Sequence, residues 1–260
     1  TDMNRSRNRH TSTLLQDGKV LVVGGVAGSS LDHVEIYDPD TDTWIVTGSL
    51  NTARFSHTAT LLPDGKVLVS GGNNNNNPLN SVEIYDPSNG TWSVVASLNF
   101  ARYNHTATLL PDGTILVVGG NSGGTYLNSA EIYDPDTDSW ASTPLLGSAR
   151  DRHSATLLPD GTVLVEGGYN ISTAELYNPV TGDWYLTSPM SAARHSHTST
   201  LLANGTVLVA GGHTGSTYLS SAELYVPTGG SWANTGSMST SKYYHNATIL
   251  PDGRVLVAGG

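Results

Sequence analysis

The sequence predicts an all-β fold built from similar four-stranded antiparallel units. One motif recurs six times, short aliphatic and β-branched runs end at Gly or Asp-Gly turns, and no segment has the 3.6-residue apolar period of an amphipathic helix. The 260 residues, 37% of them hydrophobic, suffice for a buried core. The regular placement of the apolar residues excludes a disordered chain.

The recurring motif is Arg-x-x-His, followed by a β-branched run, a turn and an aliphatic run that ends in Gly-Gly. Its first copy extends from Arg7 to Gly25. The motif histidines follow one another at steps of 47, 48, 48, 44 and 48 residues: His10, His57, His105, His153, His197 and His245. A repeat of this length corresponds to one supersecondary unit that packs against copies of itself.

Each repeat predicts four strands, A to D. Strand A follows the motif His and is rich in β-branched residues, and a turn such as Asp64-Gly65 joins it to strand B. Strand B, Lys-Val-Leu-Val in the first repeat, is apolar on both faces, which indicates burial on both sides. It ends at Gly-Gly, where the backbone needs room or a positive φ. Strand C is Val-Glu-Ile-Tyr or a close variant, and strand D begins at a Trp after a further turn.

Four antiparallel strands per repeat are typical of a β-propeller blade. By its aliphatic run before Gly-Gly, its spaced Tyr and Trp and its Arg-x-x-His entry, the chain resembles the Kelch-repeat family over nearly all of residues 3–260. The resemblance implies an all-β Kelch-type propeller. It also implies that partners bind on the face that carries the B–C and D–A loops, here called the loop face. It does not imply a particular ligand.

The repeats predict a single propeller domain over residues 1–260. The predicted repeats are 3–49, 50–97, 98–145, 146–189, 190–237 and, in part, 238–260. Five are complete and the sixth contains only strands A and B, so we expect six blades, with seven as the alternative. We also expect a fragment of a longer protein, or closure by strands from elsewhere. An open strand B would allow self-association.

The charges predict a molecule that is polarised between two faces. The net charge is −10, which argues against nucleic acid as a general partner. Thirteen aspartates fall in the A–B and C–D turns, which form the turn face, whereas nine cations fall in the D–A loops. Six cations share one repeat position and predict a positive ring for an acidic ligand group: Arg7, Arg54, Arg102, Arg150, Arg194 and Lys242. In the alternative interpretation these cations are structural, and they pair with strand-C glutamates or with loop carbonyls.

The B–C loops differ between repeats, as binding loops on a rigid scaffold often do. They supply Asn75 in an Asn-rich loop, Tyr126 in the third repeat, and His213 with Tyr218 in the fifth. Tyr rings with Asn and Gly neighbours would suit a sugar or a peptide. The alternative is that these loops are only solvated.

Three further features receive a structural interpretation or stay open. The motif histidines are expected to hydrogen-bond across blade interfaces rather than to form a metal ring. The Asp-x-Asp-x-Asp runs at 38–42 and 134–138 lack the Gly and Glu of an EF-hand loop, so we expect ordinary turns. Glu166 stands where other repeats have Val, Ser or Ala, and it either lies at the mouth or pairs with a cation such as Arg150 or Arg152.

Tyr244 and His245, with the Leu-Pro-Asp-Gly-Arg-Val run that follows, also resemble the galactose-oxidase and glyoxal-oxidase propellers. Those enzymes bind copper through such a Tyr-His pair. The chain contains no Cys, so their tyrosine–cysteine cross-link cannot form. We therefore expect no catalytic residues, no cofactor and no metal. A copper-enzyme fragment, with Tyr244 and His245 as ligands, is kept as an alternative.

These features predict a non-enzymatic binding or scaffold module. Its ligand would be a protein or a carbohydrate, with an acidic group, bound on the loop face. A second alternative is an assembly module that completes its half blade with another chain. The aliphatic runs are too short for a membrane span. Low charge and abundant Ser, Thr, Asn and Gly favour an extracellular or cell-surface protein.

Overall fold

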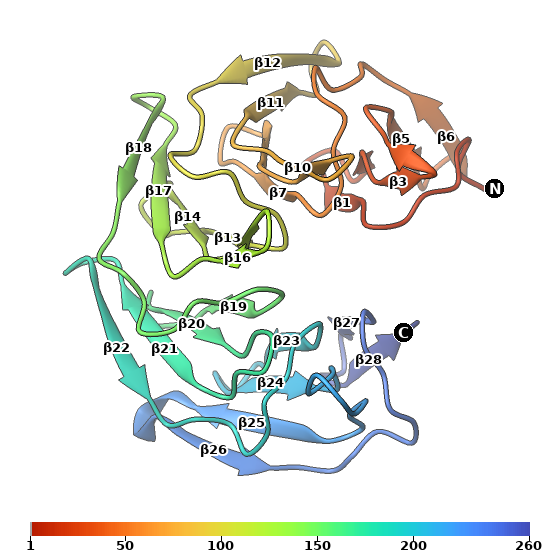
Figure 1. Cartoon of the computed structure of the whole chain (residues 1–260). Coiled ribbons are helices and arrows are strands. Elements are labelled where there is room, and N and C mark those ends of the chain that lie inside the picture. Colours follow the sequence, from red (N-terminus) through yellow and green to blue (C-terminus); the bar gives the residue numbers. More distant parts are fainter. Residues whose placement is uncertain (1) are drawn as a thin grey trace. The chain divides into compact units, whose positions relative to one another are not determined.

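The computed structural model describes residues 2–260; residue 1, which the predicted domain includes, lies outside the described part. Residues 2–260 form five four-stranded antiparallel sheets and four two-stranded sheets (Figure 1). The helical content of this part is the 3₁₀ turn η1 (Pro227–Gly229). The all-β prediction is therefore confirmed. None of the described helical residues belongs to a segment long and apolar enough to cross a membrane.

The chain divides into two compact units, which are described separately. Unit 1 comprises Thr1–Tyr126 and Glu131–Ser142, and unit 2 comprises Leu127–Ala130 and Thr143–Gly260. Each four-stranded sheet corresponds to one predicted repeat, is called a blade, and has its strands in the order A-B-C-D. Within each unit, the A strands of successive blades lie side by side.

Unit 1 contains blades 1 and 2 and, except for Ala130, blade 3. Blade 1 consists of β1 (Thr11–Leu14), β2 (Val20–Val23), β5 (Val34–Asp38) and β6 (Thr43–Val46). Blade 2 consists of β7 (Thr58–Leu61), β8 (Val67–Ser70), β11 (Val82–Asp86) and β12 (Thr91–Val95). Blade 3 consists of β13 (Thr106–Leu109), β14 (Ile115–Val118), β17 (Ala130–Asp134) and β18 (Ser139–Ser142).

Unit 2 contains blades 4 and 5 and the strands of the sixth repeat. Blade 4 consists of β19 (Ser154–Leu157), β20 (Val163–Glu166), β21 (Ala174–Asn178) and β22 (Asp183–Thr187). Blade 5 consists of β23 (Thr198–Leu201), β24 (Val207–Ala210), β25 (Ala222–Val226) and β26 (Ser231–Asn234). The sixth repeat forms the two-stranded sheet β27 (Asn246–Ile249) and β28 (Val255–Ala258), as predicted.

Short hairpins, which the sequence did not predict, occupy the B–C loops of the first three blades. They are β3 (Val26–Ala27) with β4 (Ser29–Ser30), β9 (Asn73–Asn74) with β10 (Asn77–Pro78), and β15 (Asn121–Ser122) with β16 (Thr125–Tyr126). The D–A loop of a blade pairs with the B–C loop of the same blade, as in the bridges Phe55↔Asn73 and His195↔His213. This pairing places both loop types on one face of each blade, as predicted.

The core lies between adjacent blades. Leu21 and Val23 of blade 1 pack with Val67 and Val69 of blade 2, and all four are buried. Burial on both faces explains why strand B is apolar throughout. The repeat Trp closes the outer part of the same interface: Trp92 donates from Nε1 to the carbonyl oxygen of Gly48 in the preceding blade at 2.8 Å.

The Gly-Gly pair that ends strand B is needed for both reasons that the sequence suggested. Gly71 has φ 58°, and a Cβ there would lie 2.5 Å from the carbonyl oxygen of Arg102 in the next blade. That same oxygen accepts the N–H of Gly72 at 2.8 Å. The close approach therefore joins neighbouring blades.

Three of the six motif histidines bond across blade interfaces, as predicted. The Nε2 atoms of His57, His105 and His245 lie 2.9–3.0 Å from the hydroxyls of Thr11, Thr58 and Thr198 in the preceding blades. Burial lowers the pKa of His57 to about 3, and the charges of Arg54 and His10 contribute in the same direction. This imidazole is therefore neutral in the folded protein near neutral pH.

A buried ion pair holds each blade to the D–A loop that enters it. In blade 2 the guanidinium of Arg54 donates to Glu83 Oε1 at 2.7 Å and to the carbonyl oxygens of Gly71 and Ser81 at 2.7 and 2.9 Å. The Glu83 carboxylate also accepts the backbone N–H groups of Asn51 and Thr52 at 2.7 and 3.0 Å. One contact thus connects the end of strand B, the start of strand C and the D–A loop.

The same pair recurs in every complete blade. The five pairs are Arg7–Glu35, Arg54–Glu83, Arg102–Glu131, Arg150–Glu175 and Arg194–Glu223. Burial lowers the pKa of Arg54 and Arg102, and the partner glutamates raise it again in part.

Glu166 takes neither of the two positions that the sequence suggested. It is fully buried at the interface of blades 4 and 5, where Oε1 accepts Ser199 Oγ at 2.6 Å and lies 3.8 Å from His197 Nε2. Within residues 2–260, Oε2 of Glu166 and both ring nitrogens of His197 have no hydrogen-bond partner. At the equivalent position of blade 2, the hydroxyl of Ser70 lies 3.3 Å from His105 Nε2.

The substitution Arg102→Ala should lower the free energy of unfolding by about 3–5 kcal/mol, because Glu131 stays buried without its charge partner. Urea denaturation measures this loss. Arg254→Ala removes an exposed cation on the turn face and should leave the unfolding free energy almost unchanged. Equal effects of the two substitutions would contradict a framework role for Arg102.

Acid should destabilise the protein through His57. The free energy of unfolding should fall as the pH drops below 6.5, the ordinary pKa of histidine, toward about 3, the pKa of His57 in the folded protein. The unfolded chain binds this proton first, so stability is complete above pH 6.5 and decreases by about 1.4 kcal/mol per pH unit in that window. Denaturation curves of His57→Gln should show a shallower pH dependence than wild type. Identical slopes would show that His57 does not contribute to it.

The substitution Glu166→Ser should raise the unfolding free energy by about 1–3 kcal/mol, because it removes a buried, incompletely bonded carboxylate. It also places at this interface the hydroxyl that blade 2 has at Ser70. Thermal and urea denaturation check the sign. A destabilised variant would show that the carboxylate stabilises the interface despite its unpaired oxygen.

Candidate binding site on the loop face

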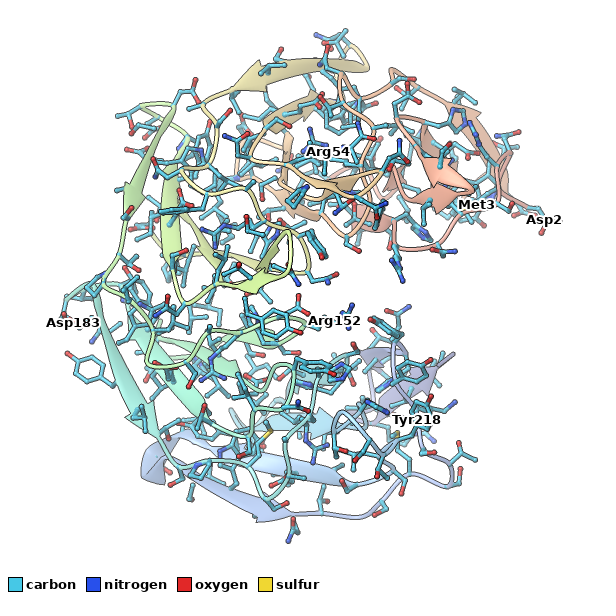
Figure 2. The ribbon with its side chains drawn as sticks, in the orientation of Figure 1. Asp2, Met3, Arg54, Arg152, Asp183 and Tyr218 are labelled. Atoms are coloured by element: carbon cyan, nitrogen blue, oxygen red, sulfur yellow. The ribbon has the colours of Figure 1, made fainter. Side chains whose placement is uncertain are left out.

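The predicted positive ring lies inside the blades. The side chains of Arg54, Arg102, Arg150 and Arg194 are 0% exposed, and Figure 2 shows Arg54 among the strands of unit 1. The Arg7 side chain is also buried, and Lys242 donates from Nζ to the carbonyl oxygen of Gly259 at 2.7 Å. These placements support the structural alternative, in which the cations hold strand-C glutamates and loop carbonyls.

The predicted loop residues of unit 1 have separate surroundings. Tyr126 ends β16 and is 39% exposed. Asn75 joins two B–C hairpins: its Oδ1 accepts the backbone N–H and the hydroxyl of Ser30 at 3.0 and 3.2 Å. The polar atoms of Asn75 thus stabilise the hairpins of blades 1 and 2.

The predicted loop residues of unit 2 lie together in a group of rings that contact one another in tilted or edge-on arrangements. This group, the aromatic platform, consists of His195, His213, Tyr218, Tyr243 and Tyr244. The ring centroids of successive members are 5.3, 4.7, 4.8 and 5.1 Å apart. The rings come from three loops: the D–A loop before β23, the B–C loop between β24 and β25, and the loop before β27. Tyr169 extends the row, because its ring centroid lies 5.2 Å from that of His195.

The platform combines a buried base with exposed rings. His195 is 5% exposed, whereas Tyr218 and Tyr244 are 53% and 54% exposed. Figure 2 labels Tyr218 on the loop between β24 and β25, and labels Asp183 at the start of β22, away from that loop. Large rings that are held on a rigid base can contact a ligand without a large loss of side-chain entropy.

Arg152 provides a cation at the edge of the platform. Its guanidinium carbon lies 5.9 Å from the centroid of the Tyr244 ring. Its side chain is 32% exposed, and Asp151 Oδ2 lies 3.6 Å from its Nε. Unlike the framework arginines, Arg152 therefore has a side chain that is partly open to solvent.

A repeated backbone feature brings Arg152 and Tyr244 into one row. The residue before each motif His has a left-handed backbone, with φ from 51° to 55°: Arg9, Ser56, Asn104, Arg152, Ser196 and Tyr244. Such values are uncommon for residues other than Gly and persist only where the surroundings enforce them. In unit 2 the N–H of Ser196 donates to the carbonyl oxygen of Arg152, and the N–H of Tyr244 donates to that of Ser196, both at 2.9 Å.

The sequence marks His195 and His213 as ligand candidates outside the repeat frame, but it does not identify Arg152 or Tyr243 as their neighbours. The available signal was the pair of changing residues between the Arg or Lys and the His of each motif, because His195 and Tyr243 take the first of these positions and Arg152 the second.

The two platform histidines have different surroundings. His213 Nδ1 accepts the N–H of Gly215 at 3.0 Å. Burial lowers the pKa of His195 to about 4, with the neighbouring Arg152, His213 and His197 contributing in the same direction.

The copper alternative receives no support from the placement of its two residues. His245 is buried at a blade interface with Nε2 on Thr198, whereas the Tyr244 ring lies exposed on the platform. Across residues 2–260, no three or more His, Cys, Asp or Glu side chains are grouped to hold a metal ion. The Asp-rich turns are ordinary, since Asp38 and Asp134 cap the N–H groups of Asp40 and Asp136.

The chain matches family models over most of its length. Residues 1–168 match the KLHDC2/KLHL20/DRC7 Kelch-repeats domain, and residues 194–239 match the Kelch motif. No curated protein matches the chain. Kelch repeats form β-propeller modules that are generally non-catalytic and bind proteins. With more than half of its residues matched to this one model, the chain belongs to the family of KLHDC2/KLHL20/DRC7 Kelch-repeats domains.

Proposed function

We propose that this chain is a non-catalytic module that binds a protein ligand on the aromatic platform of unit 2. The observation that carries the proposal is the pair of half-exposed rings, Tyr218 and Tyr244, which both contact Tyr243. Through His213, this row of rings also contacts the buried His195. Exposed tyrosines with rigid support dominate the binding energy of many protein interfaces. The platform lies on the loop face, where the resemblance to Kelch propellers places their partners.

The ligand carries an acidic group next to its contact with the rings. Framework arginines such as Arg194 are buried and neutralised by glutamates, so they are not available to a ligand. Arg152 is partly exposed beside Tyr244, and its planar guanidinium can hold a carboxylate through two hydrogen bonds. This proposal moves the predicted acid-binding role from the repeat arginines to Arg152.

A carbohydrate is the alternative ligand, because sugar faces also pack on tyrosine rings. We favour a protein ligand because Kelch repeats generally bind proteins. Alternation between exposed rings and a cation also suits an extended acidic peptide that has apolar side chains at intervals.

The proposal is tested with the full chain against a phage-displayed peptide library and a glycan array. We expect acidic peptides to be selected, and we expect Tyr218→Ala and Tyr244→Ala each to weaken a selected peptide by roughly tenfold or more. Arg152→Ala should weaken acidic peptides more than their amidated counterparts.

Tyr185 provides the matched control. It is 48% exposed on β22, an outer strand of the same unit, so Tyr185→Ala removes a similar ring away from the platform. Binding should not change. An equal loss in Tyr185→Ala would exclude the platform as the site, and binding of glycans without peptides would establish the carbohydrate alternative.

A further inference from the structure

We propose that a groove on the turn face of unit 2 binds a small organic amine with an apolar body. The groove lies between blades 4 and 5, where the A–B turns of both blades meet the C–D turn of blade 5. The aromatic platform belongs to the loop face instead. The inference therefore does not depend on the proposed function.

The groove has the size and lining of a small-molecule site. Its volume is about 510 Å³, and it is lined by residues 158–160, 203–206 and 226–228. Sites for small molecules have volumes of roughly 300–1,000 Å³ and are mostly apolar, with few polar groups that orient the ligand. The buried side chain of Leu158 contributes apolar surface here, together with Pro159, Ala203, Val226 and Pro227.

The equivalent grooves of unit 1 are lined by several carboxylates. The groove between blades 1 and 2 has a volume of about 430 Å³, and its aspartates are Asp17, Asp64 and Asp86. The groove between blades 2 and 3 has a volume of about 320 Å³, and its aspartates are Asp64, Asp112, Asp134 and Asp136. Carboxylates stay hydrated, so these two grooves do not suit an apolar ligand.

Blade 5 departs from the repeat at the positions that would make its groove acidic. Asn204, Val226 and Thr228 stand where blade 3 has aspartates. Within the lining of the groove in unit 2, the remaining carboxylate is that of Asp160 in blade 4. The groove is therefore mainly apolar and carries a single negative charge.

The change at Val226 removes a hydrogen bond from the C–D turn. In blades 3 and 4, Asp134 Oδ1 and Asn178 Oδ1 each accept the N–H of the residue two positions later, at 2.9 Å. Val226 has no side-chain acceptor, and the turn forms η1 without a side-chain cap. The framework thus gains no hydrogen bond from valine, whereas the groove gains an apolar wall.

Asp160 is placed to hold the charged end of an amine. Its Oδ1 accepts the N–H and the hydroxyl of Thr162 at 3.0 and 2.7 Å, which orients the exposed carboxylate. Asp64, the equivalent residue of blade 2, pairs with Lys66 Nζ at 3.2 Å, whereas blade 4 has Thr162 in place of the lysine. Asp160 Oδ2 can therefore accept a hydrogen bond from an ammonium group. An anionic ligand would be repelled.

The experiment follows amide chemical shifts of the isotope-labelled full chain with three probes that share a phenyl ring: phenethylamine, phenethyl alcohol and phenylpropionate. We expect Gly205, Thr206 and Thr228 to report saturable binding of phenethylamine with a Kd on the order of 1 mM, as expected for about nine non-hydrogen atoms. The alcohol should bind about fivefold more weakly, because it lacks the ion pair, and phenylpropionate should not bind. Gly113 reports on the acid-lined groove between blades 2 and 3 and is the internal control.

The substitution Asp160→Asn should lower the affinity for phenethylamine to that for the alcohol and leave the alcohol unchanged. It should preserve the turn, because Asn204 Oδ1 accepts the N–H and the hydroxyl of Thr206 in the same way, at 3.1 and 2.8 Å.

The substitution Val226→Asn removes the apolar wall and supplies the residue that blade 4 has at Asn178. It should weaken both the amine and the alcohol on the order of fivefold. Val180→Asn is the matched control, since Val180 is 92% exposed in the C–D turn of blade 4 and does not line the groove. It should not change binding.

Three results would overturn the amine site: no saturable shifts with phenethylamine, equal affinities for the amine and phenylpropionate, or equal losses in Val180→Asn and Val226→Asn. Shifts of Tyr218 in place of Gly205 would move the amine to the platform and would also overturn it. If Val226→Asn does not fold, the ratio of amine to alcohol affinity in Asp160→Asn decides the inference. None of these variants alters the platform, so peptide selection still tests the proposed function separately.

Discussion

A guanidinium–carboxylate contact is buried inside each complete blade, and the geometry of the loop face depends on it. Arg54 bonds to the ends of strands B and C, while its partner Glu83 bonds to the backbone of the loop that enters the blade. Both charges are withdrawn from water, so each is tolerable only because it is paired and hydrogen-bonded. The contact therefore permits one arrangement of the D–A loop, and its repetition gives each blade the same rigid base.

This framework also determines which residues are available to a ligand. The framework arginines have no free guanidinium, although they are the most regular cations of the sequence. The residues that differ from one repeat to the next are the left-handed residue before the motif His and the residues of the B–C loop beside it. In unit 2 these positions carry Arg152, Tyr244 and His213, and their contacts with neighbouring rings produce a surface that the repeats themselves do not encode.

The histidines illustrate how one residue type serves two purposes in this fold. His57 is enclosed between blades, where a hydroxyl satisfies it and burial keeps it neutral. His213 lies at the edge of a loop, where its Nδ1 accepts the N–H of Gly215, two residues along the chain. The first arrangement contributes to packing. The second holds a surface loop of the platform.

The strands, their order, the tight turns and the interfacial histidines could be predicted from the amino-acid sequence, because these follow from local periodicity and from a repeat that must pack against its copies. The sequence also has six cations at one repeat position and five glutamates at another. The contact of Arg54 with Glu83 rather than with solvent could not be predicted, because it depends on the register of β8 with β11 and on the path of the D–A loop. The aromatic platform is likewise tertiary, since Tyr243 meets His213 where backbone hydrogen bonds join the loop before β27 to blade 5.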